Sequence, residues 1–289
     1  MKTKTFTILA AAALLLASCC KDKVEPSETF EPYEVVPYAT KAVTFTCQGD
    51  WVQSTKNLAA NGTSMTDIWV FDYVNGLLIQ IIHQDDNTEA DFGSPSIDLS
   101  FGTHTLYFVA SRGLTPTVNT TAHTITWVKP YDTFHKALTL TVDNSTGSQA
   151  VTLERMVGKL KMTINDAIAT GTTQFIVTPT TWYYGMDYTD GSPTASASNQ
   201  AITISCPSNY VGESGKYLTV FTFSSSAQWN TNVTLAASNG TSTISSVAIN
   251  NVPIQRNRST EYSGNLFTNN GSTTLTLNDT WGEPFNGTW

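Results

Sequence analysis

The sequence predicts an all-β protein built from β-sandwich domains. Threonine, serine, asparagine and glycine are abundant, while charged residues make up only 13% of the 289 positions. This composition favours strands and turns over solvated helices. Short runs rich in β-branched and aromatic residues are separated at regular intervals by turn residues, which is typical of sandwiches. No ten-residue stretch shows convincing helical periodicity, and the length suits about two domains of roughly 100–150 residues each.

The first residues predict a lipoprotein leader. Lys2 and Lys4 precede the apolar stretch 6–16, which is long enough for a signal peptide and too short to span a bilayer. Small residues then lead to Cys19, whose thiol would take the lipid. We expect a signal peptide over residues 1–18 and a lipid anchor on Cys19. The alternative is an ordinary signal peptide followed by an incidental cysteine.

A tether is predicted over residues 19–38, because prolines and charges there prevent a packed core. The chain has a net charge of −8, and loss of residues 1–18 removes two lysines and no acid, which leaves −10. A protein this acidic is not expected to bind nucleic acid, since phosphate binding requires a basic face.

The most definite strand signal is a hairpin at Asn75–Gly76, which joins the runs 67–74 and 77–83. Both faces of the run 67–74 are apolar, so it should be a central strand covered on both sides. A domain boundary is expected near residues 155–158, between an N-terminal sandwich, 39–156, and a C-terminal sandwich, 157–289. The other expected strands are 42–47, 105–111, 124–128, 137–142, 151–155, 159–164, 174–178, 201–206, 217–223, 232–237, 243–249, 260–267 and 273–278.

Several segments of the chain follow one another in a characteristic order. A short tether follows a lipid cysteine, and a strand ends at an Asn-Gly turn. The further segments are Asp67–Asp72, Gly102–Ser111, Leu153–Leu160, Val252–Thr260 and the late Trp281. Together, in this order, they resemble the fimbrillin superfamily of Bacteroidales.

The resemblance implies two transthyretin-like β-sandwich domains and a place in type V fimbriae, whose subunits reach the outer membrane as lipoproteins. Stalk subunits of that family are cut by a trypsin-like protease, which removes the first strand and opens a groove for a strand of the next subunit. Anchor subunits keep the lipid and the first strand. The implied partners are the outer membrane, through the lipid, and other fimbrial subunits.

The sequence departs from the stalk pattern, because it has no arginine between Cys19 and Arg112. Lys41 and Lys56 are the candidate processing sites. We therefore expect an anchor or accessory subunit of a fimbria, exposed on the outer membrane and serving cell adhesion. A stalk or tip subunit is the alternative. The C-terminal stretch 273–289 is a candidate donor strand, although an ordinary last strand of the second sandwich is favoured.

No motif for catalysis, nucleotide binding or metal binding is present, so we expect no enzyme, no cofactor and no metal. The histidines have no metal-ligand spacing, and two acidic sets are more typical of solvated loops than of calcium sites. Cys47 and Cys206 are expected to be packed thiols, and a bridge between them stays open. The histidines are His83, His104, His123 and His135, and the acids are Asp85, Asp86, Glu89, Asp91, Asp187 and Asp190.

An aromatic cluster is the main candidate for a recognition surface, formed by Trp182, Tyr183, Tyr184 and Tyr188. Exposed rings there could stack on sugars or anchor a partner protein. This supports a second alternative function, a surface lipoprotein that binds glycans. The competing interpretation is that alternate rings fill the second core and the others cover a loop.

Overall fold

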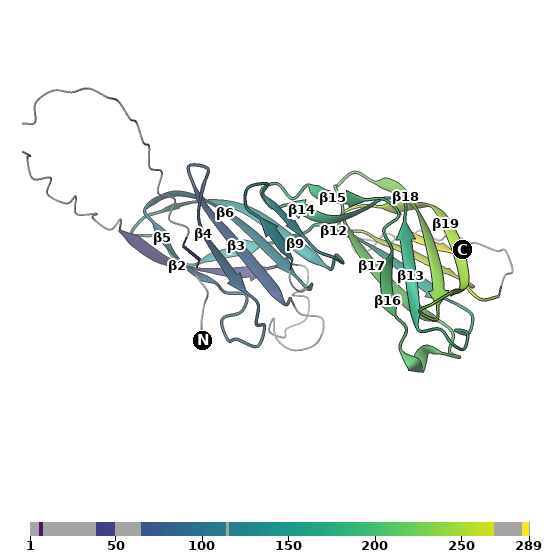
Figure 1. The fold of residues 1–289 in the computed structure, drawn as a ribbon. Coiled ribbons are helices and arrows are strands. Elements are labelled where there is room, and N and C mark those ends of the chain that lie inside the picture. Colours follow the sequence, from purple (N-terminus) through teal and green to yellow (C-terminus); the bar gives the residue numbers. More distant parts are fainter. Residues whose placement is uncertain (1–5, 8–38, 50–64, 114–115, 269–284, 289) are drawn as a thin grey trace, which may run out of the picture.

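A computed structural model describes residues 6–7, 39–49, 65–113, 116–268 and 285–288 (Figure 1). It confirms the all-β fold class. The described residues form strands, mostly in antiparallel sheets, and one short 3-10 helix, η2 (Ser208–Tyr210). No helix in these ranges is long and apolar enough to cross a membrane.

The N-terminal half packs a large sheet against a small one. In the large sheet the order is β1 (Phe6–Thr7), β4 (Leu77–Gln84), β3 (Asp67–Val74), β6 (Gly102–Ser111), β9 (Thr133–Val142) and β11 (Glu154–Arg155). In the small sheet it is β10 (Gln149–Thr152), β2 (Thr40–Gln48) and β5 (Ser96–Ser100).

Alternation of side chains explains how these two sheets enclose a core. Along β2, Val43, Phe45 and Cys47 point inward and are buried, as the two-residue period of a strand requires. Phe45 meets Phe108 of the large sheet, with ring centroids 5.3 Å apart. The strand β3 lies between β4 and β6 and is buried on both faces, as its sequence predicts.

The C-terminal half also packs two sheets around a core of its own. In one sheet the order is β17 (Lys216–Phe223), β12 (Val157–Ile164), β20 (Ser259–Gly264) and β21 (Phe285–Thr288). In the other it is β16 (Ile202–Ser205), β13 (Gln174–Pro179), β18 (Trp229–Ser238) and β19 (Thr243–Ile254).

A further sheet combines strands from both halves and lies between them (Figure 1). Beneath it is a third apolar cluster, in which Phe71 of the first half lies parallel to Tyr188 of the second, with centroids 4.0 Å apart. Phe223 stacks on Trp127 in the same cluster. The strand order is β15 (Pro193–Ala197), β14 (Trp182–Asp187), β8 (Thr124–Thr126) and β7 (Thr117–Asn119).

This shared sheet means that the expected sandwiches, 39–156 and 157–289, are not linked by a bare hinge. The chain does pass from the large N-terminal sheet to a C-terminal sheet between Arg155 and Val157, where the boundary is placed from sequence. The division into two domains stays a prediction, because side chains of both halves fill the third cluster together.

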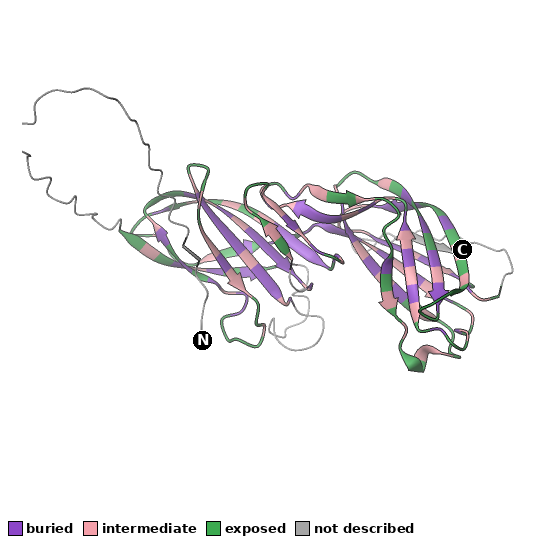
Figure 2. Cartoon of the chain, viewed as in Figure 1, coloured by how far each residue is buried: buried purple, intermediate pink, exposed green. Residues whose placement is uncertain are grey.

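The strand β14 is not among the strands expected from sequence, although its residues alternate clearly. Trp182, Tyr184, Met186 and then Tyr188 are buried, while Tyr183 and Asp187 are half-buried. The buried row runs from the C-terminal core into the third cluster. Figure 2 shows the same alternation of buried and partly exposed positions along many strands of the molecule.

Some expected elements fall outside the described residues. These include the strand 273–278, the tether and nearly all of the leader, of which the structure describes only Phe6–Thr7. Those two residues pair with Gln80 and Ile81 of β4. At the C-terminal end, the described residues Phe285–Thr288 pair in parallel with β20.

The shared sheet should be sensitive to a single methyl group at Gly185. A Cβ atom there would come 2.5 Å from the carbonyl oxygen of Ile125 and 2.6 Å from Cγ2 of Thr126, so β14 and β8 would have to separate. We expect Gly185→Ala to lower the free energy of unfolding by about 1–3 kcal/mol in urea. Gly147→Ala is the control, because nothing lies within 4 Å of its Cβ position. Equal effects of the two substitutions would contradict this packing.

Candidate functional site

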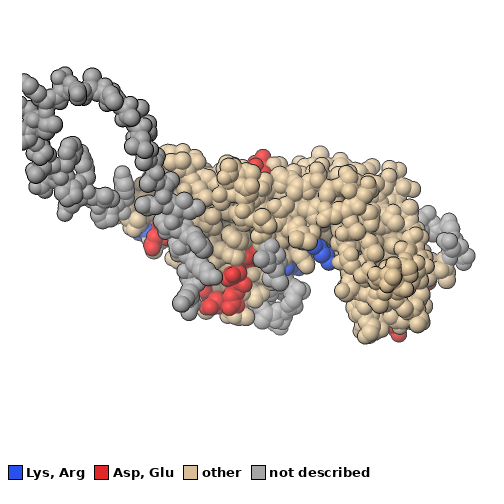
Figure 3. All heavy atoms as spheres, viewed as in Figure 1, with Lys and Arg blue, Asp and Glu red and all other residues tan. Residues whose placement is uncertain are grey.

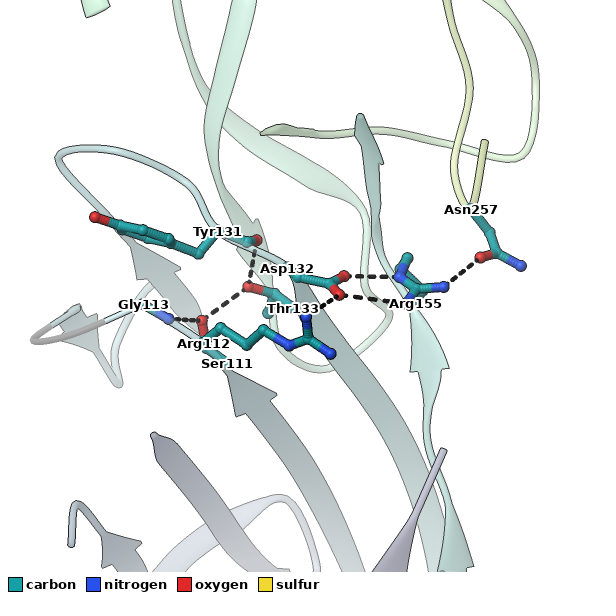
Figure 4. Close-up of polar contacts among 8 residues, drawn as sticks. All are labelled: Ser111, Arg112, Gly113, Tyr131, Asp132, Thr133, Arg155 and Asn257. Atoms are coloured by element: carbon teal, nitrogen blue, oxygen red, sulfur yellow. Dashed lines mark hydrogen bonds and ion pairs between the residues drawn. The ribbon is translucent and has the colours of Figure 1, made fainter. Parts of the chain in front are cut away.

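A buried polar network lies where the two halves meet (Figure 4). Its residues come from the end of β6, the segment between β8 and β9, the short strand β11, and the turn between β19 and β20. We call these contacts the junction network, and the region between the two halves in which they lie the junction. Its members are Ser111, Arg112, Gly113, Tyr131, Asp132, Thr133, Arg155 and Asn257.

A buried carboxylate, that of Asp132, is the centre of the network. Arg155 donates from Nε to Oδ1 at 2.7 Å and from Nη2 to Oδ2 at 3.2 Å, and both side chains are almost fully buried. Such a two-pronged contact is the geometry in which a guanidinium matches a carboxylate best. The pair fixes β11 against the segment that leads into β9.

Arg155 also reaches across to the C-terminal half. Its Nη1 donates to Oδ1 of Asn257 at 3.0 Å, and its guanidinium lies over the ring of Phe134, 4.6 Å from the centroid. One side chain thus joins a carboxylate of the first half to an amide of the second.

Asn257 is held in place by its backbone. Its φ is +57°, a left-handed conformation that asparagine tolerates better than most residues. Its N–H donates to the carbonyl of Val157 at 2.9 Å, and the N–H of Lys159 donates to the carbonyl of Arg258. Between them, a Cβ on Gly158 would come 2.8 Å from the carbonyl oxygen of Gln255, so glycine permits this close approach.

Arg112 is the second guanidinium beside Asp132. Its Nη1 lies 3.7 Å from Oδ2, beyond hydrogen-bond distance, whereas Arg155 bonds to both oxygens. Within the described chain, Nε of Arg112 is buried without a hydrogen-bond partner. Burial lowers the pKa of Arg112, the charge of Asp132 opposes this, and Arg155 lowers it further.

Hydrogen bonds between uncharged groups connect the end of β6 to the start of β9. The hydroxyls of Ser111 and Thr133 lie 3.0 Å apart, and Ser111 Oγ also accepts from the N–H of Gly113. Thr133 Oγ1 donates to the carbonyl of Tyr131 at 2.9 Å. A side chain on Gly113 would collide with the Tyr131 ring, which lies 2.4 Å from the Cβ position. The network therefore places two cations beside one carboxylate, with neutral hydrogen bonds around them.

The predicted recognition residues are placed mostly inside the protein. Trp182, Tyr184 and Tyr188 are at most 5% exposed, so three of the four rings cannot form an exposed surface. Their alternation in β14 turns them into the core, which is the competing interpretation made from sequence. Tyr183 is half-buried, and its ring meets that of Trp229 edge-on.

Of the candidate processing and lipid sites, the structure describes only Lys41. Lys41 lies in β2, where it pairs with Leu99 of β5 and its Nζ donates to the carbonyl of Asn144 at 2.7 Å. Cys19 and Lys56 lie outside the described residues. Cys47 and Cys206 are free thiols, and burial raises the pKa of Cys47 to about 12.

The predicted acidic sets are exposed or serve their own turns. Asp85, Asp86, Glu89 and Asp91 are exposed. Asp187 accepts from the N–H and hydroxyl of Thr189, and Asp190 accepts in the same way from Ser192. Among the residues the structure describes, no three His, Cys, Asp or Glu side chains lie close enough to hold a metal ion.

The structure brings Ser100, His104 and Asp72 into a row that sequence reasoning missed. His104 Nδ1 lies 2.6 Å from Asp72 Oδ1, and Nε2 lies 3.2 Å from Ser100 Oγ. The same Nε2 lies 2.9 Å from the Ser100 carbonyl oxygen, which can only accept, so Nε2 carries a proton and cannot take one from the hydroxyl. Both Asp72 and His104 are buried, so the row holds the core and does not activate a nucleophile. No local motif signals it, because β3 and β6 contribute separately.

Comparison with protein families gives a match to the model of DUF6562, a family of unknown function, over residues 106–288. No curated protein matches the sequence.

Three solved structures illustrate what the fold is similar to. A candidate adhesin from Bacteroides ovatus has a TM-score of 0.47 at 10% identity, covering 75% of this chain and 79% of that one. A candidate polysaccharide-binding protein from Bacteroides thetaiotaomicron scores 0.46 at 11% identity, covering 72% and 80%. The fimbrial anchor protein Mfa2 from Porphyromonas gingivalis scores 0.43 at 9% identity, covering 72% and 82%. At these scores no function of this chain follows from the likeness.

Removing the central carboxylate should be far more damaging than removing an exposed one. Asp132→Ala leaves Arg112 and Arg155 without their shared counter-ion, and we expect a loss of about 3–5 kcal/mol in the free energy of unfolding. Glu154→Ala is the matched control, because its ion pair with Lys136 is exposed and worth about 0–1 kcal/mol. Urea unfolding of both variants measures the difference. Comparable losses would show that the Asp132 pair is not the stabilising contact.

His135 should make the junction sensitive to acid. Burial lowers its pKa, a bond from Nε2 to the Tyr188 carbonyl opposes this, and Arg256 lowers it further. In the unfolded chain the pKa of this histidine is about 6.5. Below that pH the unfolded chain binds a proton that the folded chain does not, so the free energy of unfolding falls as the pH decreases. His135→Gln should remove this contribution, measured as the pH dependence of the unfolding free energy. Parallel curves for the two proteins would refute it.

Proposed function

This chain belongs to the DUF6562 family, whose function is unknown, and we propose that it is a structural subunit of the cell surface. The role proposed is that of an outer-membrane lipoprotein that anchors a type V-like fimbria through Cys19. The observation that carries the proposal is the place of the first strand of the body, β2, inside the N-terminal sandwich.

The strand β2 is a central part of its sheet. It pairs in parallel with β10 along Phe45–Gln48 and antiparallel with β5 along Thr40–Thr44. Its inward residues fill the N-terminal core. Loss of β2 would leave those side-chain positions empty and the facing edges of β5 and β10 unpaired, which is costly. A subunit that keeps this strand fits the anchor role, in which lipid and first strand stay attached.

The surroundings of Lys41 support retention of the strand. The bond after Lys41 lies between two residues paired with β5, since Lys41 faces Leu99 and Ala42 faces Asp98. A trypsin-like protease needs an accessible chain, whereas this bond is part of a ladder. Cleavage after Lys56 would remove β2 and produce the stalk subunit of the alternative. N-terminal analysis of the mature protein distinguishes this stalk subunit from an anchor.

Two segments that carry the fimbrillin resemblance also form the junction. Arg155 belongs to Leu153–Leu160 and Asn257 to Val252–Thr260, and these two side chains bond to each other. The resemblance thus rests on residues that position the two halves. The glycan-binding alternative was based on exposed rings, and three of the four rings are buried.

The anchor role predicts the chemical state of the mature N-terminus. Mass spectrometry of the protein from native membranes should show an acylated Cys19 in a chain that still includes residues 40–48. Cys19→Ala should abolish incorporation of labelled fatty acid and membrane retention, while Cys20→Ala should keep both.

The opposite results are equally specific. A mature terminus at Asn57 in sheared fimbriae would identify a stalk subunit. Full fatty-acid labelling of Cys19→Ala would remove the lipid anchor from the proposal.

A further inference from the structure

The arginines of this acidic chain are concentrated in one place. The sequence contains four, and its net charge is −8. Arg112 and Arg155 flank Asp132. Arg256 donates from Nε to the Ser224 carbonyl and lies 3.8 Å from the sulfur of Met156. The backbone of Arg258 pairs with Lys159. Figure 3 shows Lys and Arg atoms gathered where the two halves meet, and Asp and Glu atoms gathered on the N-terminal half.

Arg112 is the member of this group that shares its only nearby anion among the described residues with another arginine. Asp132 is the only acid within ion-pair distance of it in the described part of the chain, and both Asp132 oxygens already bond to Arg155. The Arg112 side chain is 29% exposed, so a ligand can reach it. A second carboxylate would supply the acceptors that the guanidinium is missing.

We propose that the junction binds a carboxylate of an acidic polypeptide at Arg112, and that this polypeptide is the stretch Val24–Tyr38 of this chain. The proposal does not depend on lipidation, since the stretch follows Cys19 in either case.

Charge complementarity favours this occupant. The stretch Val24–Tyr38 contains four glutamates, spaced three residues apart, and no lysine or arginine. The glutamates are Glu25, Glu28, Glu31 and Glu34. Repeated carboxylates raise the chance that one meets Arg112, and the remainder interact with the field of the other arginines.

The length of the chain also permits the contact. The stretch joins β2 next to Thr40, while the opposite end of β2 lies at the junction, because the Gln48 carbonyl accepts from Leu153, two residues before Arg155. Nine strand residues span about 30 Å, and the fifteen residues of Val24–Tyr38 span up to about 50 Å. A chain can therefore reach its own junction or that of a neighbouring copy.

An acidic sugar would offer the same carboxylate but fits the surroundings less well. Sugar recognition uses open aromatic faces. The aromatic ring of the junction network, that of Tyr131, packs on Gly113 and is 37% exposed. Most of the aromatic cluster in β14 is buried. The glycan is therefore an outcome to be tested against the peptide.

The test uses the full chain with all four glutamates replaced by glutamine, so that its own stretch does not occupy the site. The probe is a fluorescent peptide of residues 24–38, followed by anisotropy, with a peptide carrying the same four glutamines as its partner. We expect the glutamate peptide to bind at least about tenfold more tightly. Adding Arg112→Gln to the receptor should abolish this preference, and Arg112→Lys should restore part of it. Lys216→Gln, which removes a charge of similar exposure, 30%, should have no effect.

The wild-type chain shows whether the stretch 24–38 binds the junction of its own chain or that of a neighbouring copy. If it binds its own junction, dilute wild-type protein will exclude the peptide; if it binds a neighbour, sedimentation will show salt-sensitive self-association. Equal binding of both peptides, no binding, or binding unaffected by Arg112→Gln in a receptor with an unchanged melting temperature would overturn the proposal. Preferential binding of an oligogalacturonate in place of the peptide would overturn it in favour of a glycan.

Discussion

The carboxylate of Asp132 has to be neutralised inside the protein, and the arrangement of the two halves follows from how this is done. Arg155 binds both of its oxygens, and the same guanidinium is fixed by Asn257 from the other half. Isolated, either charge would be expensive to bury. Arg155 therefore links the two halves, because its ion pair lies within the first half and its hydrogen bond to Asn257 crosses to the second.

Apolar packing between the two halves surrounds the junction network. The sheet formed by β7, β8, β14 and β15 takes strands from both halves, and the buried row of β14 extends from the C-terminal core to Tyr188, which lies against Phe71. A hinge between two independent sandwiches would expose these rings. The rings are instead packed together between the two halves.

Patterns with a two-residue period predicted most of the fold, because they report local burial. The hairpin at Asn75–Gly76 and the alternation of residues 159–164 correspond to β3, β4 and β12. The aromatic run at Trp182 has the same period, but rings also suit a binding surface, and sequence alone did not decide between core and surface. The junction network was missed for a different reason. Asp132, Arg155 and Asn257 are far apart in sequence and carry no motif. They meet because β11 pairs with β9 and because the Asn257 backbone bonds to Val157.

Cooperativity of unfolding tests the coupling of the two halves most directly. If the ion pair and the shared sheet make the halves one unit, calorimetry of the whole chain should give a single transition, with equal calorimetric and van't Hoff enthalpies. Two transitions, or a calorimetric enthalpy well above the van't Hoff value, would show that the halves unfold independently. That result would contradict a junction that holds the two halves together as one structure.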